Sequence, residues 1–247
     1  MNQSHKLIHP NWLSPKNVHA FTTTRYYGGT SQGSYENMNL GLHVHDNPIN
    51  VIANREILRN LLPNEPCWLE QVHGKNIVIA QKYDTLPVAD ASYTLIPNQV
   101  CIIQTADCLP ILISNQQGTQ VAAIHGGWRS LVQGIIAETI SKFNQPKEEL
   151  VVWLGPAIGT SAFEIGMEVR DLFISQEKGM EKAFTPSQRT NHWYANIYEI
   201  AKLFLLKEGV TQIWGGNHCT YHENNLFYSY RRDGEKTGRM ASVIWFT

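Results

Sequence analysis

The sequence predicts an α+β fold with mixed β-sheets. Short apolar runs of strand length are interspersed irregularly with amphipathic helical segments, whereas a regular parallel array would repeat strand, helix and strand. Several of these runs are joined by short polar turns, which is typical of antiparallel hairpins. The two observations together favour strands of both orientations over a single parallel sheet.

The individual elements follow from turn signals and from the spacing of apolar residues. A helix is predicted after Asn47, because Pro48 suits a first helical turn and apolar residues then recur at helical spacing until Pro63. Polar turns predict two hairpins, centred on 73–76 and on 115–118. The predicted flanking strands are 68–72, 77–80, 109–114 and 119–124, the other strands are 100–105, 150–154, 226–230 and 240–246, and the further helices are 130–143 and 197–207.

Composition excludes several classes of function. The chain has 247 residues, of which 43% are hydrophobic, and no linker or low-complexity tract, so we expect one domain over residues 1–247. The net charge of −1 lacks the basic field that nucleic-acid binding requires, which favours a small-molecule substrate. No apolar run approaches the roughly 18 residues of a membrane span, and Met1–Pro10 contains no signal-peptide core.

The four cysteines form no CxxC pair. In a chain without a visible secretion signal, this predicts free thiols rather than a disulfide framework. We therefore expect a cytoplasmic protein that acts on small molecules, either as a monomer or as a homodimer, without nucleic-acid or membrane partners.

Three residues with metal-binding or nucleophilic chemistry stand where predicted strands end. They are His73, Cys108 and His125, and each directly follows or closely follows an apolar run. One thiolate and two imidazoles suit a catalytic zinc site, which takes three protein ligands and leaves a fourth position for water or substrate. Asp90 and Asp107 are candidates to accept hydrogen bonds from the imidazoles of such a site.

Spacing alone leaves other interpretations open. Cys108 could be a metal-free nucleophile with His125 as its base, or both side chains could simply be buried and satisfied. Either chemical interpretation predicts an enzyme. The segment His218-Cys219-Thr220-Tyr221-His222 could hold a second metal, but ligands in adjacent positions fit one tetrahedral ion poorly, and packing near the active cleft is favoured.

A series of short motifs runs along nearly the whole chain. They are Phe21-Thr22-Thr23-Thr24-Arg25, Asn37-Met38-Asn39-Leu40-Gly41, Asn54-Arg55, Gln71-Val72-His73-Gly74, Thr105-Ala106-Asp107-Cys108-Leu109-Pro110, Ala123-Ile124-His125-Gly126-Gly127-Trp128-Arg129, Gly155-Pro156-Ala157-Ile158-Gly159, Phe163-Glu164-Ile165-Gly166, Cys219-Thr220, Ser229-Tyr230-Arg231-Arg232-Asp233-Gly234 and Thr237-Gly238-Arg239-Met240-Ala241. In this order they resemble the YfiH family, whose members are also described as polyphenol-oxidase or laccase-domain proteins, purine nucleoside phosphorylases and peptidoglycan editing factors.

The resemblance implies a four-layer α/β/β/α sandwich and a zinc site formed by His73, Cys108 and His125. It also implies phosphorolysis of adenosine, inosine, guanosine and methylthioadenosine to the free base and (methylthio)ribose-1-phosphate, with adenosine deamination as a second activity. The alternatives are a cysteine-type amidase that edits serine-misincorporated peptidoglycan precursors, and copper-dependent oxidation of polyphenols.

True multicopper oxidases need several His-x-His pairs, and this chain has one, His43 and His45. Copper at the Cys/His site is possible because copper heads the divalent affinity order. We therefore expect zinc as the cofactor, copper as an adventitious occupant, and the His43–His45 pair as part of a loop near the site.

Phosphorolysis requires a site for inorganic phosphate, and arginine suits it because the guanidinium donates two parallel hydrogen bonds. By resemblance, Arg55 is the first candidate for contact with substrate or phosphate and for a catalytic role. Arg129, Arg231 and Arg239 lie in similar motifs, although such residues often form surface ion pairs. Of these, Arg129 and Arg231 are the further substrate-binding candidates, and Arg129 precedes a predicted helix N-terminus, which favours anions.

Other residues in the motifs have weaker assignments. Trp128, Phe163 and Tyr230 could stack on a purine, and Glu164 and Asp107 could handle protons. The chain departs from the usual family pattern at Gly126, Ser130 and Asn196, where Ala, Gly and Asp are more common. None of these departures falls on a proposed metal ligand.

Overall fold

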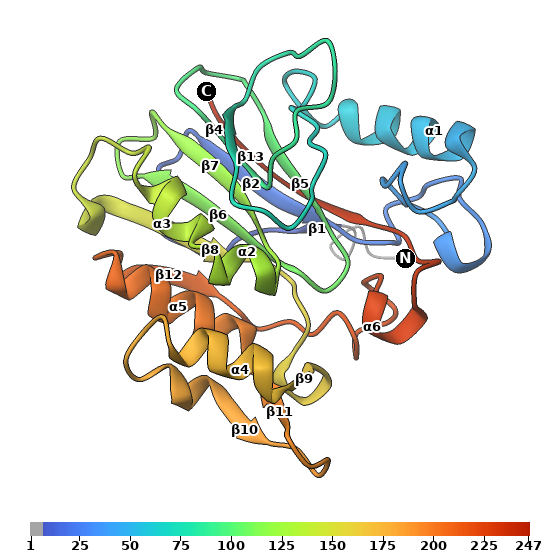
Figure 1. Cartoon of the computed structure of the whole chain (residues 1–247). Coiled ribbons are helices and arrows are strands. Elements are labelled where there is room, and N and C mark those ends of the chain that lie inside the picture. The colour runs from blue at the N-terminus through green and yellow to red at the C-terminus, as the bar shows by residue number, and fades with distance from the viewer. Residues whose placement is uncertain (1–6) are drawn as a thin grey trace.

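The computed structural model describes residues 7–247, and residues 1–6, within the Met1–Pro10 stretch that lacks a signal-peptide core, lie outside the described residues. Two β-sheets packed face to face form the centre of the molecule (Figure 1). The first sheet has the order β1-β2-β13-β5, and all of its neighbouring strands are antiparallel. Its strands are β1 (Leu7–Ile8), β2 (Val18–Thr23), β13 (Met240–Phe246) and β5 (Cys101–Thr105).

The second sheet has six strands in the order β12-β8-β6-β7-β4-β3. The pairs β12–β8 and β3–β4 are parallel, whereas β8–β6, β6–β7 and β7–β4 are antiparallel, so this sheet is mixed as predicted. Its strands are β12 (Gln212–Gly215), β8 (Leu150–Leu154), β6 (Leu109–Asn115), β7 (Val121–Gly126), β4 (Ala91–Thr94) and β3 (Ile77–Ile79).

Alternate residues along each strand contribute to two different core layers, one between the two sheets and one beneath the outer helices. Side chains of successive strand residues point to opposite faces of a sheet, so Cys101 and Ile103 of β5 face the second sheet while Ile102 faces away. Leu112, Ala123 and Trp153 meet them from the second sheet. The core between the two sheets therefore consists of alternate residues from both, and its edge carries the functional loops.

Helices cover the two outer faces. The helix α1 (Pro48–Arg59) lies over the four-stranded sheet, where Leu58 joins a core cluster with residues of β2, β5 and β13. The helices α2 (Trp128–Val132), α3 (Ile135–Ile140) and α5 (Ile197–Lys207) cover the six-stranded sheet. The four-layer α/β/β/α arrangement implied by the resemblance is confirmed, except that only one of the two main sheets is mixed.

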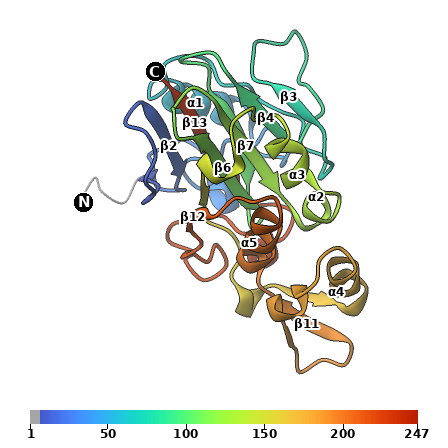
Figure 2. The same ribbon diagram turned by 90° about the vertical axis from the view of Figure 1, so that its left-hand side faces the viewer.

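A smaller unit extends below the main sheets, as Figure 2 shows. It contains a three-stranded antiparallel sheet in the order β10-β11-β9 and the helix α4 (Met167–Ile174). Its strands are β9 (Glu164–Gly166), β10 (Phe184–Pro186) and β11 (His192–Ala195). Outside this unit, the short helix α6 (Tyr230–Asp233) lies near the end of the chain. Single 3-10 turns cover Gly33–Tyr35, Lys147–Glu149, Thr160–Ala162 and Met180–Ala183.

Three predicted elements differ from the structure. The hairpin around 73–76 is wrong, because residues 68–72 form no strand and β3 pairs in parallel with β4. The single helix over 130–143 is two helices, interrupted at Gly134, whose φ of 86° is left-handed. The strand over 226–230 is absent from the described structure, where Tyr230 instead begins α6. In each case a turn or a tertiary contact overrides the local apolar pattern.

None of the helices in the described part of the chain has the length and apolar character needed to cross a membrane.

Asn54, a buried residue of α1, orders residues 30–39 through hydrogen bonds. Its Oδ1 accepts from the Thr30 amide at 2.8 Å, and its Nδ2 donates to the carbonyls of Asn37 at 3.0 Å and Asn39 at 2.8 Å. The Nδ2 group also lies 2.9 Å from Ser31 Oγ. This side chain therefore supplies hydrogen bonds to the backbone of residues 30–39 of the kind that a neighbouring strand would otherwise supply.

Replacing Asn54 with alanine is expected to destabilise the fold by about 2–4 kcal/mol, because it leaves several buried backbone groups without partners. Glu56→Ala, on the exposed side of the same helix, is the matched control and should change stability by less than about 0.5 kcal/mol. Urea unfolding of both variants measures the difference. Equal effects of the two substitutions would contradict the assigned role of Asn54.

Candidate metal and substrate site

His73, Cys108 and His125 converge at one edge of the two sheets. Their ligand atoms all lie within 4.8 Å of one another. The Cys108 Sγ is 3.6 Å from His73 Nε2, and the two imidazole rings have centroids 4.7 Å apart at 69°. The sequence prediction that these residues come together is confirmed in the geometry of the described chain.

Strand register explains why Cys108 and His125 meet. In the β6–β7 pair, Leu109 lies opposite Gly126, so Cys108, just before β6, lies beside the end of β7. His125 has the same strand parity as Val121 and Ala123, which face the core between the sheets. Both functional side chains are therefore set by rigid hydrogen-bonded strands.

His73 comes from a loop, and Asp90 holds that loop in place. The Asp90 carboxylate accepts from the amides of Val72 at 3.2 Å, His73 at 2.9 Å and Gly74 at 2.6 Å. His73 has a φ of 60°, a left-handed conformation that costs free energy for a residue with a β carbon. The three hydrogen bonds stabilise this strained turn and aim the imidazole at Cys108.

Asp90 also orients His125. The Nδ1 of His125 donates to Asp90 Oδ1 at 2.7 Å, and the His125 amide donates to the Asp90 carbonyl at 2.7 Å. With Nδ1 engaged, Nε2 is the nitrogen of His125 that is left for a metal ion. The prediction for Asp90 is confirmed, whereas the carboxylate of Asp107 binds Thr220 Oγ1 at 2.6 Å and the Arg231 amide at 2.7 Å rather than an imidazole.

The donor set fits a tetrahedral zinc ion. With Zn–S near 2.3 Å and Zn–N near 2.0–2.1 Å, tetrahedral sulfur and nitrogen ligands lie about 3.6 Å apart. The observed Sγ–Nε2 separation of 3.6 Å matches this spacing. Within residues 7–247, this is the one group of three or more His, Cys, Asp or Glu side chains close enough to share an ion.

The electrostatics of the metal-free cluster favour a thiolate on Cys108 beside a protonated His125. Burial lowers the pKa of His125, but the Cys108 charge and the hydrogen bonds to Asp90 and Cys108 outweigh burial and raise the pKa to about 9, so metal binding would release this proton. Burial raises the pKa of the Cys108 thiol, but the charge and hydrogen bond of His125 and the hydrogen bond of His73 outweigh burial and lower the pKa to about 6. Burial also raises the pKa of Asp90, and the hydrogen bonds from His125 and the loop amides reverse this and lower the pKa. Cys108 is therefore prepared to act as a thiolate, the form that binds metal or attacks an electrophile.

A cavity of about 520 Å³ opens beside the cluster. It is large enough for a small organic ligand. Its walls combine the three cluster residues with polar and aromatic side chains from distant parts of the chain. The other lining residues are His43, Gln71, Gln104, Thr105, Ala106, Asp107, Trp128, Arg129, Ile158, Phe163, Ile197, Tyr230, Arg231 and Arg239.

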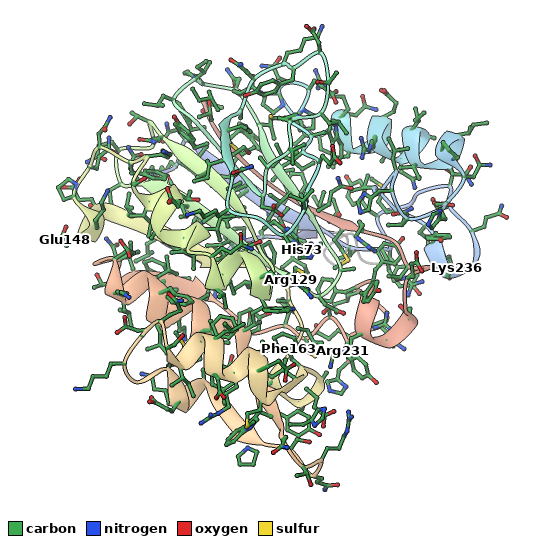
Figure 3. The ribbon with its side chains drawn as sticks, in the orientation of Figure 1. His73, Arg129, Glu148, Phe163, Arg231 and Lys236 are labelled. Atoms are coloured by element: carbon green, nitrogen blue, oxygen red, sulfur yellow. The ribbon has the colours of Figure 1, made fainter. Side chains whose placement is uncertain are left out.

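Three of the four arginines named from the sequence, Arg129, Arg231 and Arg239, line this cavity, and Arg55 does not. Figure 3 shows Arg129, Phe163 and Arg231 below His73, between the main sheets and the smaller unit. The Arg129 guanidinium stacks on Trp128 at 4.3 Å, and Arg231 donates to the carbonyls of Ala162 and Glu164.

Arg55 lies on α1, outside the lining of the cavity. Its guanidinium stacks on the Trp68 ring at 3.6 Å, and its Nε donates to the Leu40 carbonyl at 3.0 Å. Burial lowers the pKa of Arg55 to about 10 despite the opposing charge of Glu65. The role of Arg55 in substrate binding stays a prediction, and it requires that the ligand extend from the cavity to α1.

Other predicted residues have definite places. Trp128, Phe163 and Tyr230 all line the cavity, as does His43. His45 instead lies 3.6 Å from Glu235, so the two histidines of the pair do not act together. Glu164 is outside the lining and forms an ion pair with Arg189 at 2.8 Å.

The His218–His222 segment lines a separate cavity of about 430 Å³. His218 Nδ1 lies 2.9 Å from Glu223 Oε2, and Cys219 Sγ accepts from the Gly159 amide at 3.2 Å. Asn196, which also lines this second cavity, caps α5 by accepting from the Glu199 amide at 3.1 Å. Asparagine and aspartate are equivalent in a helix cap, which explains why the departure from the family pattern is tolerated.

Sequence reasoning missed two glutamines in the wall. The Gln71 side chain pairs with the backbone of Gln104, donating at 2.8 Å and accepting at 2.7 Å. This pairing extends the edge of β5 and positions the loop that carries His73. The only sequence signal was the position of Gln71, two residues before His73, and that signal does not reveal its partner.

Comparison with known proteins shows the family of this chain. The model of a family described as "multi-copper polyphenol oxidoreductase laccase" matches residues 18–247. A YfiH protein of Escherichia coli K12 is 48% identical over 244 residues, covering 97% of this chain and 98% of the relative. The chain belongs to the YfiH family.

Relatives match nearly the whole length of this chain, and solved structures share its fold. A Haemophilus influenzae protein named purine nucleoside phosphorylase is 46% identical over 242 residues, covering 97% of this chain and 98% of the relative. A crystal structure of a Neisseria meningitidis protein has a TM-score of 0.93 at 43% identity and covers 98% of this chain and 99% of its own. A Bacillus licheniformis protein titled YfiH gives a TM-score of 0.88 at 28% identity, covering 93% of each chain.

Gly127 makes room for the cluster, and its replacement tests the site. A β carbon there would lie 2.6 Å from His73 Cδ2 and 3.4 Å from Cys108 Sγ, although φ −66° and ψ 152° are open to alanine. Gly127→Ala is therefore expected to displace His73 and lower zinc affinity about 10- to 100-fold. Competition with a chromogenic zinc chelator measures the affinity.

Gly74→Ala is the matched control in the same loop. A β carbon at Gly74 meets Asp90 Oδ2 at 3.5 Å, an ordinary contact, so this variant should keep the affinity of the wild type within about threefold. Equal affinity of the Gly127→Ala protein and the wild type would show that the cluster does not bind zinc as described.

Proposed function

We propose that this chain is a zinc-dependent purine nucleoside phosphorylase, with residues 1–247 acting as one catalytic domain. The observation that carries the proposal is the convergence of His73, Cys108 and His125 beside a cavity of about 520 Å³. Relatives that cover nearly the whole chain are named purine nucleoside phosphorylases. The substrates would be adenosine, inosine, guanosine and methylthioadenosine, with adenosine deamination as a second activity.

His73, Cys108 and His125 would hold the zinc ion. When bound, zinc supplies Lewis-acid chemistry within reach of the substrate. The protein's contribution is to keep both imidazoles aimed at the ion through Asp90 and to present the Cys108 sulfur as a thiolate. His73, Cys108 and His125 all line the cavity, so a zinc ion held by them would lie beside a substrate bound there.

Aromatic side chains in the cavity suit the purine. Trp128, Phe163 and Tyr230 line the wall together with Ile158 and Ile197. Flat rings and aliphatic groups bind a purine by stacking and exclude water from the glycosidic bond. In phosphorolysis, a phosphate oxygen forms a bond to C1′ while the bond from C1′ to the purine nitrogen breaks and the base leaves with the electron pair and gains a proton.

The arginines at the cavity would orient charged and polar parts of the ligands. Arg129 is exposed and stacked on Trp128, and Arg231 is fixed by two carbonyls beside Phe163. Fixed guanidinium groups bind phosphate and ribose hydroxyls with little further loss of entropy. Arg55 remains a candidate for the same task from α1.

A cysteine-type amidase is the second candidate, because one observation favours it. The lowered pKa of Cys108 and the 3.6 Å contact with His73 would also suit a metal-free nucleophile attacking an amide of a peptidoglycan precursor. Copper-dependent oxidation of polyphenols rests on the family description alone. The structure offers a single cluster of three ligands within residues 7–247 for it.

The deciding experiment incubates zinc-loaded protein with adenosine, inosine, guanosine and methylthioadenosine, with and without phosphate. We expect free base and the corresponding sugar-1-phosphate only when phosphate is present, and loss of at least about 100-fold in kcat/KM for Cys108→Ala. Phosphate-independent inosine production from adenosine would report the deaminase activity.

The same assays separate the alternatives. Removing metal with a chelator should abolish nucleoside cleavage, and zinc should restore it. Amidase activity that survives chelation and is blocked by iodoacetamide would support the metal-free nucleophile. Absence of phosphate-dependent cleavage of all four nucleosides would overturn the proposal.

A further inference from the structure

Arg239 differs from the other arginines of the cavity in its burial. It directly precedes β13 and lines the cavity together with Arg129 and Arg231, but those two are exposed whereas Arg239 is partly buried. Among residues 7–247, its guanidinium has no carboxylate within salt-bridge distance. A partly buried cation without a paired carboxylate loses hydration that no ion pair replaces, so its presence calls for a functional reason.

The side chain is fixed by the backbone around it. Its Nη1 donates to the carbonyls of Thr237 at 2.9 Å and Gly238 at 3.0 Å, and its own amide donates to Asn39 Oδ1 at 2.9 Å. A β carbon at Gly41 would lie 2.8 Å from Arg239 Cγ, so the bare glycine lets the arginine stem pass. Nε and Nη2 have no partner in the described part of the chain and can donate to a ligand.

The Arg239 guanidinium interacts electrostatically with Cys108 of the metal cluster. Burial lowers the pKa of Arg239, and the largest opposing influence is Cys108, followed by Asp107. The Asp107 carboxylate is already engaged by Thr220 and the Arg231 amide. Both anionic groups that influence Arg239 most are therefore engaged elsewhere, Cys108 in the metal cluster and Asp107 with Thr220 and Arg231.

We propose that Arg239 is the main anchor for inorganic phosphate in the cavity. This inference rests on the proposed phosphorolysis. A fixed and partly dehydrated guanidinium binds phosphate more strongly than an exposed one, because less water competes for its donors. Arg129 and Arg231 then serve the nucleoside, and Arg55, stacked on Trp68 outside the lining, is not the primary phosphate ligand.

Steady-state kinetics with varied phosphate test the assignment. Arg239→Met should raise KM for phosphate about 10- to 100-fold while changing KM for the nucleoside by less than about threefold. Arg239→Lys, which keeps the charge but loses the fork, should fall between the wild type and Arg239→Met. Arg170→Met is the matched control, since Arg170 is a partly buried arginine stacked on Trp193 at 4.0 Å and outside the cavity lining.

A binding measurement gives a readout that does not depend on turnover. Isothermal titration of inorganic phosphate into the wild type should show binding that Arg239→Met loses and Arg170→Met keeps. In the wild type, phosphate should also protect Arg239 from phenylglyoxal, with modification mapped by mass spectrometry. This second experiment applies even if the Arg239 variants do not fold.

The outcomes distinguish this inference from the proposed function. If the wild type cleaves nucleosides with phosphate but Arg239→Met keeps its KM for phosphate, or phosphate protects Arg55, Arg129 or Arg231 and not Arg239, the assignment is wrong while phosphorolysis stands. If no phosphate-dependent cleavage occurs, the proposed function fails. Phosphate binding and protection at Arg239 would then still establish the anion site, and their absence would overturn it.

Discussion

The buried carboxylate of Asp90 is the interaction on which the site depends. It accepts one hydrogen bond from His125 and three from the amides of residues 72–74, so a single side chain couples a rigid strand to a loop. A buried charge is tolerated only when its lone pairs are satisfied, and here each satisfying bond also aims a functional group. The strained φ of His73 is stable because this network holds it.

Two sheets and their register provide the frame around that carboxylate. The β4–β7 pairing places Asp90 next to His125, and the β6–β7 pairing places Cys108 beside the same strand end. Much of the remaining cavity wall comes from segments near residues 128, 163, 197 and 230–239, which lie far from one another in the sequence. The fold therefore joins a preorganised cluster to a wall of aromatic and cationic groups, an arrangement that suits a small polar ligand with a flat ring.

The extent to which sequence predicted this structure depended on the range of the interactions. Local signals were sufficient for α1, α5 and the β6–β7 hairpin, because capping residues, helical spacing and a polar turn act within a few residues. The convergence of Cys108 with two histidines followed from the chemistry of the residue types and from the family resemblance. The hairpin at 73–76 failed because the order there comes from Asp90, 17 residues from His73, and the partner of Gln71 lies 33 residues away. Neither partner leaves a periodic trace in the sequence.

X-ray absorption at the zinc edge of protein purified without added metal tests the central claim most directly. The account predicts one zinc ion per chain with a single sulfur ligand near 2.3 Å and two imidazole nitrogens near 2.0 Å, and loss of the sulfur shell in Cys108→Ala. A spectrum without sulfur, or one that is unchanged by that substitution, would contradict the site described for this chain.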